Sequence, residues 1–168
     1  MEKIILVDEN DNKIGLMEKL EAHKKGLLHR AFSGFIFNDK NELLLQRRDF
    51  NKYHNGGLWS NTVCSHPRDN ETNLDAICRR IFEEFGFKCE NFKEVGHFIY
   101  EAKFPNGLIE NEYDYIFIAK YDNQTINPNP VEICDYKWIS KTDLQNEISN
   151  NPNNYTFWLK QILKMNIW

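Results

Sequence analysis

Three histidines and two glutamates, far apart along the chain, are candidate metal ligands. In an extended segment Glu110 and Glu112 point to the same side, because side chains alternate along a strand. Imidazoles together with carboxylates suit Mn²⁺, Fe²⁺ or Zn²⁺, and suit Mg²⁺ less well. No two of these residues form a compact motif, so spacing alone favours a plainer interpretation, surface side chains beside a sheet. The set is His23, His29, His66, Glu110 and Glu112.

A cysteine close to one of these histidines is the second candidate for chemistry. Cys64 and His66 are two positions apart in a stretch that alternates like a strand, so both side chains lie on one face. A thiol that follows an apolar residue such as Val63 is usually a small buried hydrophobe. A neighbouring imidazole and the turn at Pro67 instead favour a reactive thiolate. Both interpretations remain open at this level.

An amphipathic helix is predicted directly after this stretch. Thr72 with Asp75 three residues later resembles a capping box, and Gly86 supplies a left-handed C-terminal stop. Apolar residues recur at the helical period and predict a single buried face. That face comprises Leu74, Ile77, Cys78, Ile81, Phe82 and Phe85.

Charged residues border this helical stripe and the other candidates. Arg80 and Glu84 are one helical turn apart, which by itself predicts a surface ion pair worth about 0.3 kcal/mol. In a functional interpretation Glu84 reaches a cation and Arg80 a phosphate. Three further basic residues lie near the candidate ligands in sequence, and each alone is ordinarily a solvated charge. They are Lys19, Arg48 and Lys52.

Composition limits the classes of protein that this chain represents. Its 168 residues suit one domain, spanning residues 1–168, and the net charge of −4 gives no bulk attraction to nucleic acid or an anionic membrane. No apolar run approaches the roughly 20 residues of a membrane span, and the N-terminal residues lack the apolar core of a secretory signal. Four cysteines without a Cys-x-x-Cys pair indicate free thiols in the cytoplasm. We expect a monomer or a weak homodimer.

The remaining pattern predicts an α+β fold. Strands are expected at residues 4–7, 13–17, 32–37, 42–47, 91–100, 112–121 and 133–139. Shorter helices are expected within residues 18–28 and 140–150, and one helix at residues 153–168, with Phe157, Trp158, Ile162 and Met165 facing inward. His54 and His97 have no evident partners and are interpreted as structural. Strands around one central helix, with helices at the end, predict a mixed α+β sandwich.

The predicted helix resembles the Nudix box. With residues 83–87 aligned on the closing Glu-Glu-x-Gly of that motif, Glu71 and Arg79 fall at matching positions. Two positions depart from it, because Ser65 stands where the box has Gly and Arg80 stands where it has a metal-binding Glu. A pyrophosphohydrolase that lacked this carboxylate would hold its catalytic Mg²⁺ poorly.

These departures, and motifs along almost the whole chain, resemble the type I isopentenyl-diphosphate isomerases. The motifs are LLHRAFS at residues 27–33, LLLQRR at 43–48, SNTVCSHP at 60–67 and ENEYDY at 110–115. The resemblance implies a Nudix-like mixed β-sheet sandwich with flanking helices. It also implies metal-dependent conversion of isopentenyl diphosphate to dimethylallyl diphosphate through a tertiary carbocation, without a redox cofactor. The alternative is a Nudix pyrophosphohydrolase that acts on a nucleotide or prenyl diphosphate.

The resemblance further implies a role for each matching residue. Cys64 and Glu112 match the catalytic thiol and glutamate, and Tyr100 the tyrosine beside that glutamate. The implied ligands of one ion, Mn²⁺, Zn²⁺ or Mg²⁺, are His23, His29, His66, Glu110 and Glu112. Glu84 matches the site of a Mg²⁺ that arrives with the diphosphate, and Trp158 the indole over the hydrocarbon end of the substrate. The implied diphosphate contacts are Lys19, Arg48, Lys52 and Arg80.

Overall fold

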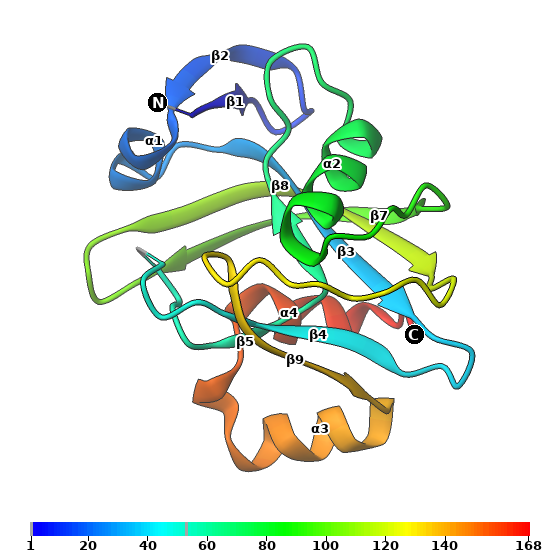
Figure 1. The fold of residues 1–168 in the computed structure, drawn as a ribbon. Helices are drawn as coiled ribbons and strands as arrows, with labels where there is room; N and C mark the ends of the chain where they lie inside the picture. Colours follow the sequence, from blue (N-terminus) through cyan, green and yellow to red (C-terminus); the bar gives the residue numbers. More distant parts are fainter. Residues whose placement is uncertain (1, 53) are drawn as a thin grey trace.

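Helices cover both faces of a mixed β-sheet in the computed structural model, which describes residues 2–52 and 54–168 (Figure 1). Within these residues the strands are β1 (Lys3–Val7), β2 (Lys13–Glu18), β3 (His29–Phe37), β4 (Leu43–Arg48), β5 (Trp59–Ser60), β6 (Val63–Ser65), β7 (Lys93–Lys103), β8 (Ile109–Lys120) and β9 (Ile133–Ile139). The helices are α1 (Lys19–Lys25), α2 (Asn73–Phe85), α3 (Lys141–Asn150) and α4 (Phe157–Ile162). The α+β prediction is confirmed.

Strand β3 connects the parts of the sheet. It runs parallel to β8 from the pair His29–Glu112 to the pair Phe37–Lys120, and antiparallel to β1 and β6. Strand β7 extends the sheet beyond β8, to which it is antiparallel. Strand β4 meets β3 at the single pair Phe37–Leu43 and then continues beside β5 and β9. The sheet therefore divides at the end of β3, and the site described below lies toward the opposite ends of β3 and β4, where His29 and Arg48 are found.

Apolar side chains fill a core on each face of the sheet. Along β4, Leu44 packs with Ile77 of α2 on one face, whereas Leu43 and Leu45 pack with Leu159 of α4 on the other. Successive strand residues point to opposite faces, so the three consecutive leucines of β4 are buried between helices on both sides. This arrangement confirms the predicted sandwich, with α2 and α3 on opposite sides of the molecule in Figure 1.

Helix α2 has the predicted ends but a rotated buried face. Thr72 accepts a hydrogen bond from the backbone N–H of Asp75 at 3.1 Å, and Gly86 ends the helix with φ of 73°. The prediction of a buried Leu74 and Phe82 was wrong, because these side chains are 43% and 54% exposed. The buried face is turned toward Glu84, which is only 3% exposed, since this helix covers a polar pocket as well as a core.

The C-terminal segment is not the single helix predicted for residues 153–168. A 3₁₀ turn (Pro152–Asn154) precedes α4, and another (Leu163–Met165) follows it. Between the first turn and α4 the chain is extended, and the N–H of Thr156 donates to the carbonyl of Trp59 at 2.9 Å. Trp158 and Ile162 are buried as predicted, whereas Met165 is 41% exposed because it lies in the last 3₁₀ turn.

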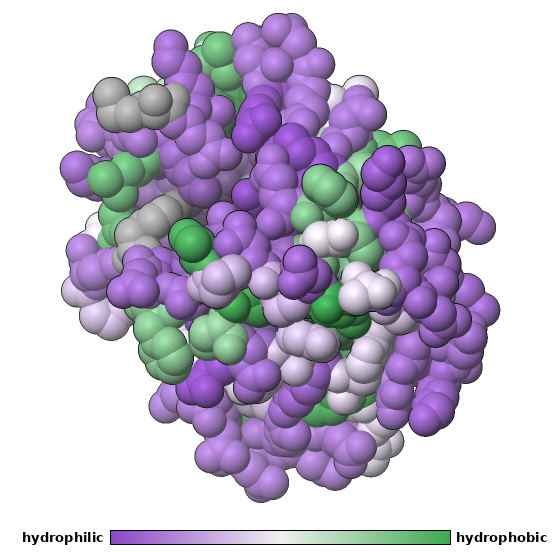
Figure 2. Space-filling view, in the orientation of Figure 1, coloured by the Kyte–Doolittle hydropathy of each residue, from purple (hydrophilic) through white to green (hydrophobic). Residues whose placement is uncertain are grey.

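The surface is mainly polar. Figure 2 shows a face on which hydrophilic residues predominate and apolar residues form small, separate groups. In residues 2–52 and 54–168 we find no helix with the length and apolar character that a membrane crossing requires.

Candidate active site

The pairing of three strands brings two predicted catalytic residues, Tyr100 and Glu112, into one row with the predicted metal ligand His29. His29 of β3 is opposite Glu112 of β8, and Glu112 is opposite Tyr100 of β7. Glu110 lies two residues earlier on β8 and faces the same side. The Tyr100 hydroxyl lies 2.9 Å from an oxygen of Glu110 and 2.7 Å from one of Glu112, within hydrogen-bond distance of both. The row therefore joins two buried carboxylates to one phenol.

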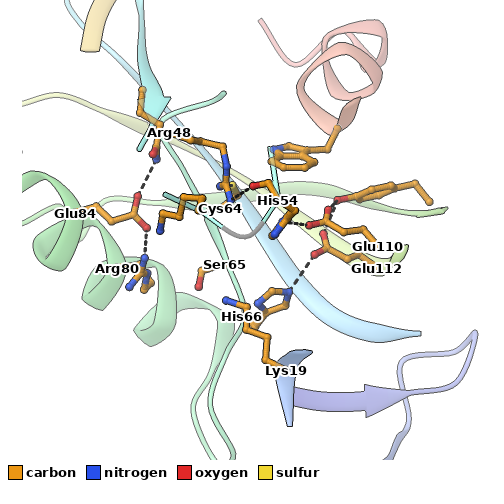
Figure 3. Close-up of a pocket in the computed structure, with 14 residues that line it drawn as sticks. Lys19, Arg48, His54, Cys64, Ser65, His66, Arg80, Glu84, Glu110 and Glu112 are labelled. Atoms are coloured by element: carbon orange, nitrogen blue, oxygen red, sulfur yellow. Dashed lines mark hydrogen bonds and ion pairs between the residues drawn. The ribbon is translucent and has the colours of Figure 1, made fainter. Parts of the chain in front are cut away.

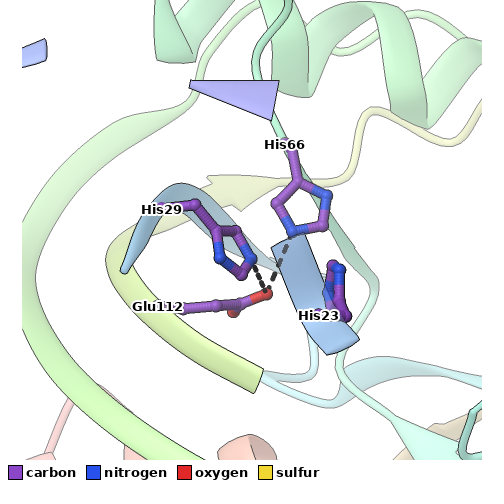
Figure 4. A group of neighbouring side chains, drawn as sticks. All are labelled: His23, His29, His66 and Glu112. Atoms are coloured by element: carbon purple, nitrogen blue, oxygen red, sulfur yellow. Dashed lines mark hydrogen bonds and ion pairs between the residues drawn. The ribbon is translucent and has the colours of Figure 1, made fainter. Parts of the chain in front are cut away.

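Two further histidines reach this row from other elements and complete a polar cluster. His23 comes from α1, and His66 directly follows β6 (Figure 4). Nε2 of His66 and Nε2 of His29 lie 3.1 Å and 3.6 Å from the same oxygen of Glu112. One potential ligand atom from each of His23, His29, His66 and Glu112 lies within 4.8 Å of the others, and all four residues are buried. Glu110 adds an oxygen 4.0 Å from Nε2 of His23.

Backbone contacts fix the proton positions on two of these imidazoles. Nδ1 of His23 lies 2.6 Å from the carbonyl of Lys19, and Nδ1 of His29 lies 2.7 Å from that of Leu27. A carbonyl only accepts, so each Nδ1 carries the hydrogen, and the neutral ring keeps its Nε2 lone pair for the cluster. Among the residues described, Nε2 of His29 is buried without a hydrogen-bond donor or acceptor. Imidazole lone pairs beside carboxylates fit a divalent cation.

Burial and neighbouring charges shift the pKa values in this cluster. Burial lowers the pKa of His23, and lowers that of His66 to about 3. Burial also disfavours the ionised Glu112, but the adjoining imidazoles of His29 and His66 outweigh this effect and hold its pKa well below the usual value. Burial raises the pKa of Tyr100 well above that of a free phenol. Neutral imidazoles beside an ionised carboxylate are the protonation states that a cation requires.

In the presence of EDTA, which removes metal ions, acid should therefore destabilise the protein. Between pH 7 and pH 5 the unfolded chain protonates the imidazole of His66, whereas the folded chain does not, so the free energy of unfolding falls as pH falls. The expected loss from His66 alone is about 2 kcal/mol. Glu112 contributes little in this window, because its carboxyl is mostly ionised in both the folded and the unfolded chain above pH 5. Urea unfolding in EDTA at both pH values measures the loss, and a His66→Gln variant should show a smaller one. Equal stabilities at pH 7 and pH 5 would contradict the expectation.

A pocket beside the cluster collects the other predicted site residues (Figure 3). Figure 3 shows Arg80 and Glu84 reaching in from α2 on one side, with Glu110 and Glu112 on the other. The structure thus brings together every predicted site residue except His23 and His29 at one pocket, and these two adjoin it through the cluster. The pocket is lined by Lys19, Gln46, Arg48, Lys52, His54, Cys64, Ser65, His66, Arg80, Glu84, Tyr100, Glu110, Glu112 and Trp158.

Both oxygens of the buried Glu84 are held in place. Arg80 donates to one oxygen at 2.5 Å, and the side-chain amide of Gln46 donates to the other at 2.8 Å. Arg80 also lies 3.3 Å from Glu132, which in turn contacts Lys52. This end of the pocket therefore alternates acidic and basic groups, and its two cations line the pocket beside the carboxylate.

Cys64 lies at the apolar end of the pocket. Its partly buried side chain packs against a cluster of Tyr100, Ala102 and Trp158. The guanidinium of Arg48 lies 3.8 Å from its Sγ and 5.6 Å from the ring centre of Trp158. Burial raises the pKa of the Cys64 thiol to about 12, even though Arg48 acts in the opposite direction. The side chain is therefore a neutral thiol that lines the pocket.

His54, for which the sequence showed no partner, has one in the structure. This buried histidine lines the pocket, and its Nε2 contacts an oxygen of Glu110. Its ring also lies 5.7 Å from that of Phe104. The available signal was its place two residues after Lys52, itself a predicted site residue. His97, by contrast, stacks on Tyr113 with ring centres 5.0 Å apart, as a structural residue would.

Comparison with known proteins adds an independent view of this fold and site. A family model described as the NUDIX domain matches residues 27–159. A protein from Aromatoleum aromaticum named isopentenyl-diphosphate Delta-isomerase 2 is 48% identical over 162 residues, which cover 96% of this chain and 85% of that protein. A protein of the same name from Photorhabdus laumondii is 49% identical over 96% of this chain and 90% of its own length.

Solved structures show the same fold at low sequence identity. DR0079 from Deinococcus radiodurans aligns over 99% of this chain and 100% of its own, with a TM-score of 0.81 and 18% identity. A MutT protein from Methanosarcina mazei aligns over 82% of this chain and 91% of its own, with a TM-score of 0.67 and 19% identity. These similarities show the fold, and the chemistry has to be argued from the residues of the site.

Proposed function

We propose that this chain, which belongs to the isopentenyl-diphosphate Delta-isomerase family of NUDIX-domain proteins, converts isopentenyl diphosphate to dimethylallyl diphosphate. The observation that carries the proposal is the pairing of two chemically different ends in one pocket. One end holds basic side chains around Glu84, which suits a diphosphate. The other holds Cys64, Tyr100 and Trp158 beside the buried His and Glu cluster, which suits a short hydrocarbon and a moving proton.

The reaction needs a proton gained at one carbon and a proton lost at another. Protonation of the alkene makes a tertiary carbocation, which water would trap, so the site needs an acid, a base, an aromatic face and closure against solvent. Glu112 with Tyr100, and Cys64, are the two groups that we assign to proton transfer, in either order. The indole of Trp158 can stabilise the cation through its π face, by about 2 kcal/mol in a dry pocket.

Charged groups hold the diphosphate end of the substrate. We assign this role to the four cations that line the pocket, because bidentate and charge-assisted contacts to phosphate oxygens orient a small substrate. The cations are Lys19, Arg48, Lys52 and Arg80. A fixed diphosphate places the alkene between the two proton-transfer groups, where a small displacement would stop the reaction.

Divalent ions complete the proposed enzyme. We assign Mn²⁺, Zn²⁺ or Mg²⁺ to His23, His29, His66, Glu110 and Glu112, and the Mg²⁺ that accompanies the diphosphate to Glu84. When bound, these ions supply positive charge that stabilises the carboxylates and neutralises the diphosphate. Their identity remains a proposal, as do a cytoplasmic location, supported by four free cysteines, and a monomeric or weakly dimeric state.

A Nudix pyrophosphohydrolase is the alternative, and the surroundings of Glu84 argue against it. Arg80 occupies the position at which the Nudix box has a metal-binding glutamate, and its guanidinium pairs with Glu84 at 2.5 Å. A cation at this point repels the additional Mg²⁺ that hydrolysis of a diphosphate would require. Among the described residues of α2, Glu84 is the one carboxylate that lines the pocket.

An assay of both activities tests the proposal. With Mg²⁺ and Mn²⁺ present, we expect the purified protein to convert isopentenyl diphosphate to dimethylallyl diphosphate and, in D₂O, to incorporate deuterium into both. NMR of the reaction mixture follows the allylic product, and a colorimetric phosphate assay with nucleoside diphosphates or prenyl diphosphates follows hydrolysis. Phosphate release without the allylic product would replace the isomerase proposal with the hydrolase.

A further inference from the structure

A hydrogen-bonded group of buried polar side chains lies behind the indole of Trp158. The indole N–H lies 3.0 Å from Oγ of Ser60 and 3.0 Å from Oδ1 of Asn61. Ser60, Asn61 and Thr156 have no exposed surface, and Trp158 is 2% exposed. A single donor placed between two acceptors in a dry interior has a strongly defined direction. The ring of Trp158 is therefore held at its polar edge.

The two acceptors are themselves held by the sheet. The amide nitrogen of Asn61 donates to the carbonyls of Gly34 at 3.1 Å and Val63 at 2.8 Å, which belong to β3 and β6. The Ser60 hydroxyl donates to Oδ1 of Asn61 at 3.0 Å and accepts from the Thr156 hydroxyl at 3.2 Å. This network connects two central strands to the start of α4, which carries Trp158, and so limits the movement of the indole.

The same network reaches the thiol. Oγ of Ser60 lies 3.9 Å from Sγ of Cys64, and Cys64 packs against the cluster that contains Trp158. Ser60 thus contacts both the proposed proton-transfer thiol and the proposed cation-stabilising ring, although it is not among the residues that line the pocket.

We propose that Ser60, supported by Asn61, is a positioning residue that fixes the orientation of the Trp158 indole relative to the Cys64 thiol. The inference rests on the proposed isomerase function, because it assigns the fixed ring to stabilisation of the carbocation. Cation–π attraction depends on the position of the charge over the ring face, so a ring that rotates loses transition-state stabilisation. Of the four cations assigned to the diphosphate, Arg48 lies over the indole at 5.6 Å, so we expect a smaller effect of ring orientation on substrate binding than on turnover.

The test compares Ser60→Ala with wild type and with a matched control. Ser149→Ala removes a hydroxyl that is exposed and bonded to the carbonyl of Gln145 within α3, so it should leave all readouts unchanged. For Ser60→Ala we expect kcat to fall about tenfold with KM within about twofold of wild type. Ser60→Thr, which keeps the hydroxyl, should recover most of the loss. An unchanged kcat, or a rise in KM alone, would overturn the inference.

A second readout does not depend on activity. The indole N–H resonance of Trp158, assigned by its absence in Trp158→Phe, should shift in Ser60→Ala and exchange faster with D₂O. In the Trp158→Phe background, which has no N–H, Ser60→Ala should lower kcat much less than in wild type, because the interaction between the two side chains is already absent. Additive losses, or an unmoved resonance, would overturn the positioning role.

The design separates this inference from the function on which it rests. A wild-type protein without isomerase activity defeats the proposed function, whereas an active wild type with an equally active Ser60→Ala variant defeats the inference alone. If Ser60→Ala does not fold, Thr156→Val provides a second variant, since it removes the hydroxyl that donates to Ser60 with little change of shape. It should alter the same resonance and lower kcat in the same direction, and no change in either would contradict the proposal.

Discussion

Replacement of Cys64 by alanine is expected to lower isomerase kcat by about 10³-fold or more, with the fold retained. The thiol is one of two groups assigned to proton transfer. The other is Glu112 of β8, which accepts a hydrogen bond from Tyr100 of β7. Water is not a substitute, because it would trap the carbocation instead of exchanging a proton with it. The loss of one buried sulfur atom leaves the hydrogen bonds of Ser60 and Asn61 in place.

The measurement is product formation and deuterium incorporation from isopentenyl diphosphate, with circular dichroism to verify the fold. Cys78→Ala is the matched control, because this second free thiol lies on α2 and packs against the core away from the pocket. We expect it to keep activity close to that of wild type. A Cys64→Ala variant with wild-type exchange and turnover would remove the thiol from the mechanism and leave Glu112 to act alone.

Removal of the divalent ion is expected to abolish activity and to lower the melting temperature by about 10 °C. The candidate ligands come from α1, from β3, from β8 and from the segment that follows β6, so the site does not exist in the unfolded chain. An ion at 1,000 times its dissociation constant stabilises the native state by about 4 kcal/mol. In a chain of this size each kcal/mol shifts the midpoint by about 2–4 °C.

Calorimetry with and without EDTA, followed by addition of Mn²⁺ or Zn²⁺, measures this effect. A His29→Ala variant should lose the metal-dependent part of the stability, because Nε2 of His29 faces the other ligands. His97→Ala is the matched control, since this exposed histidine stacks on Tyr113 outside the cluster and should leave the response to metal intact. A melting curve that EDTA does not move would exclude a resident ion.

Local patterns predicted most elements because their causes are local. The cap at Thr72, the stop at Gly86 and the apolar run at the start of β4 depend on neighbouring residues alone. The rotated face of α2 was not predictable in this way, because it depends on a polar pocket that distant strands form. The break in the terminal helix likewise depends on the carbonyl of Trp59, almost a hundred residues earlier.

The site likewise has features that the sequence predicted and features that depend on distant segments. The resemblance to a known family identified most residues of the pocket. Spacing alone could not show that His29 lies opposite Glu112 on two parallel strands. The contacts of His54 and Ser60 were not predicted, because the partner of each comes from another segment, Glu110 and Trp158 respectively. Such roles are absent from any local pattern and become visible only when the strands are placed side by side.

The parallel pairing of β3 with β8 has a consequence for biosynthesis. His29 is translated early, but its neighbour Glu112 is translated only after about two thirds of the chain, and Trp158 almost at the end. A nascent polypeptide therefore presents unpaired imidazoles for most of its synthesis, and native pairing between distant segments forms slowly. Cells that make this protein under metal excess would expose those early histidines to the wrong ion before the correct set of donors is complete.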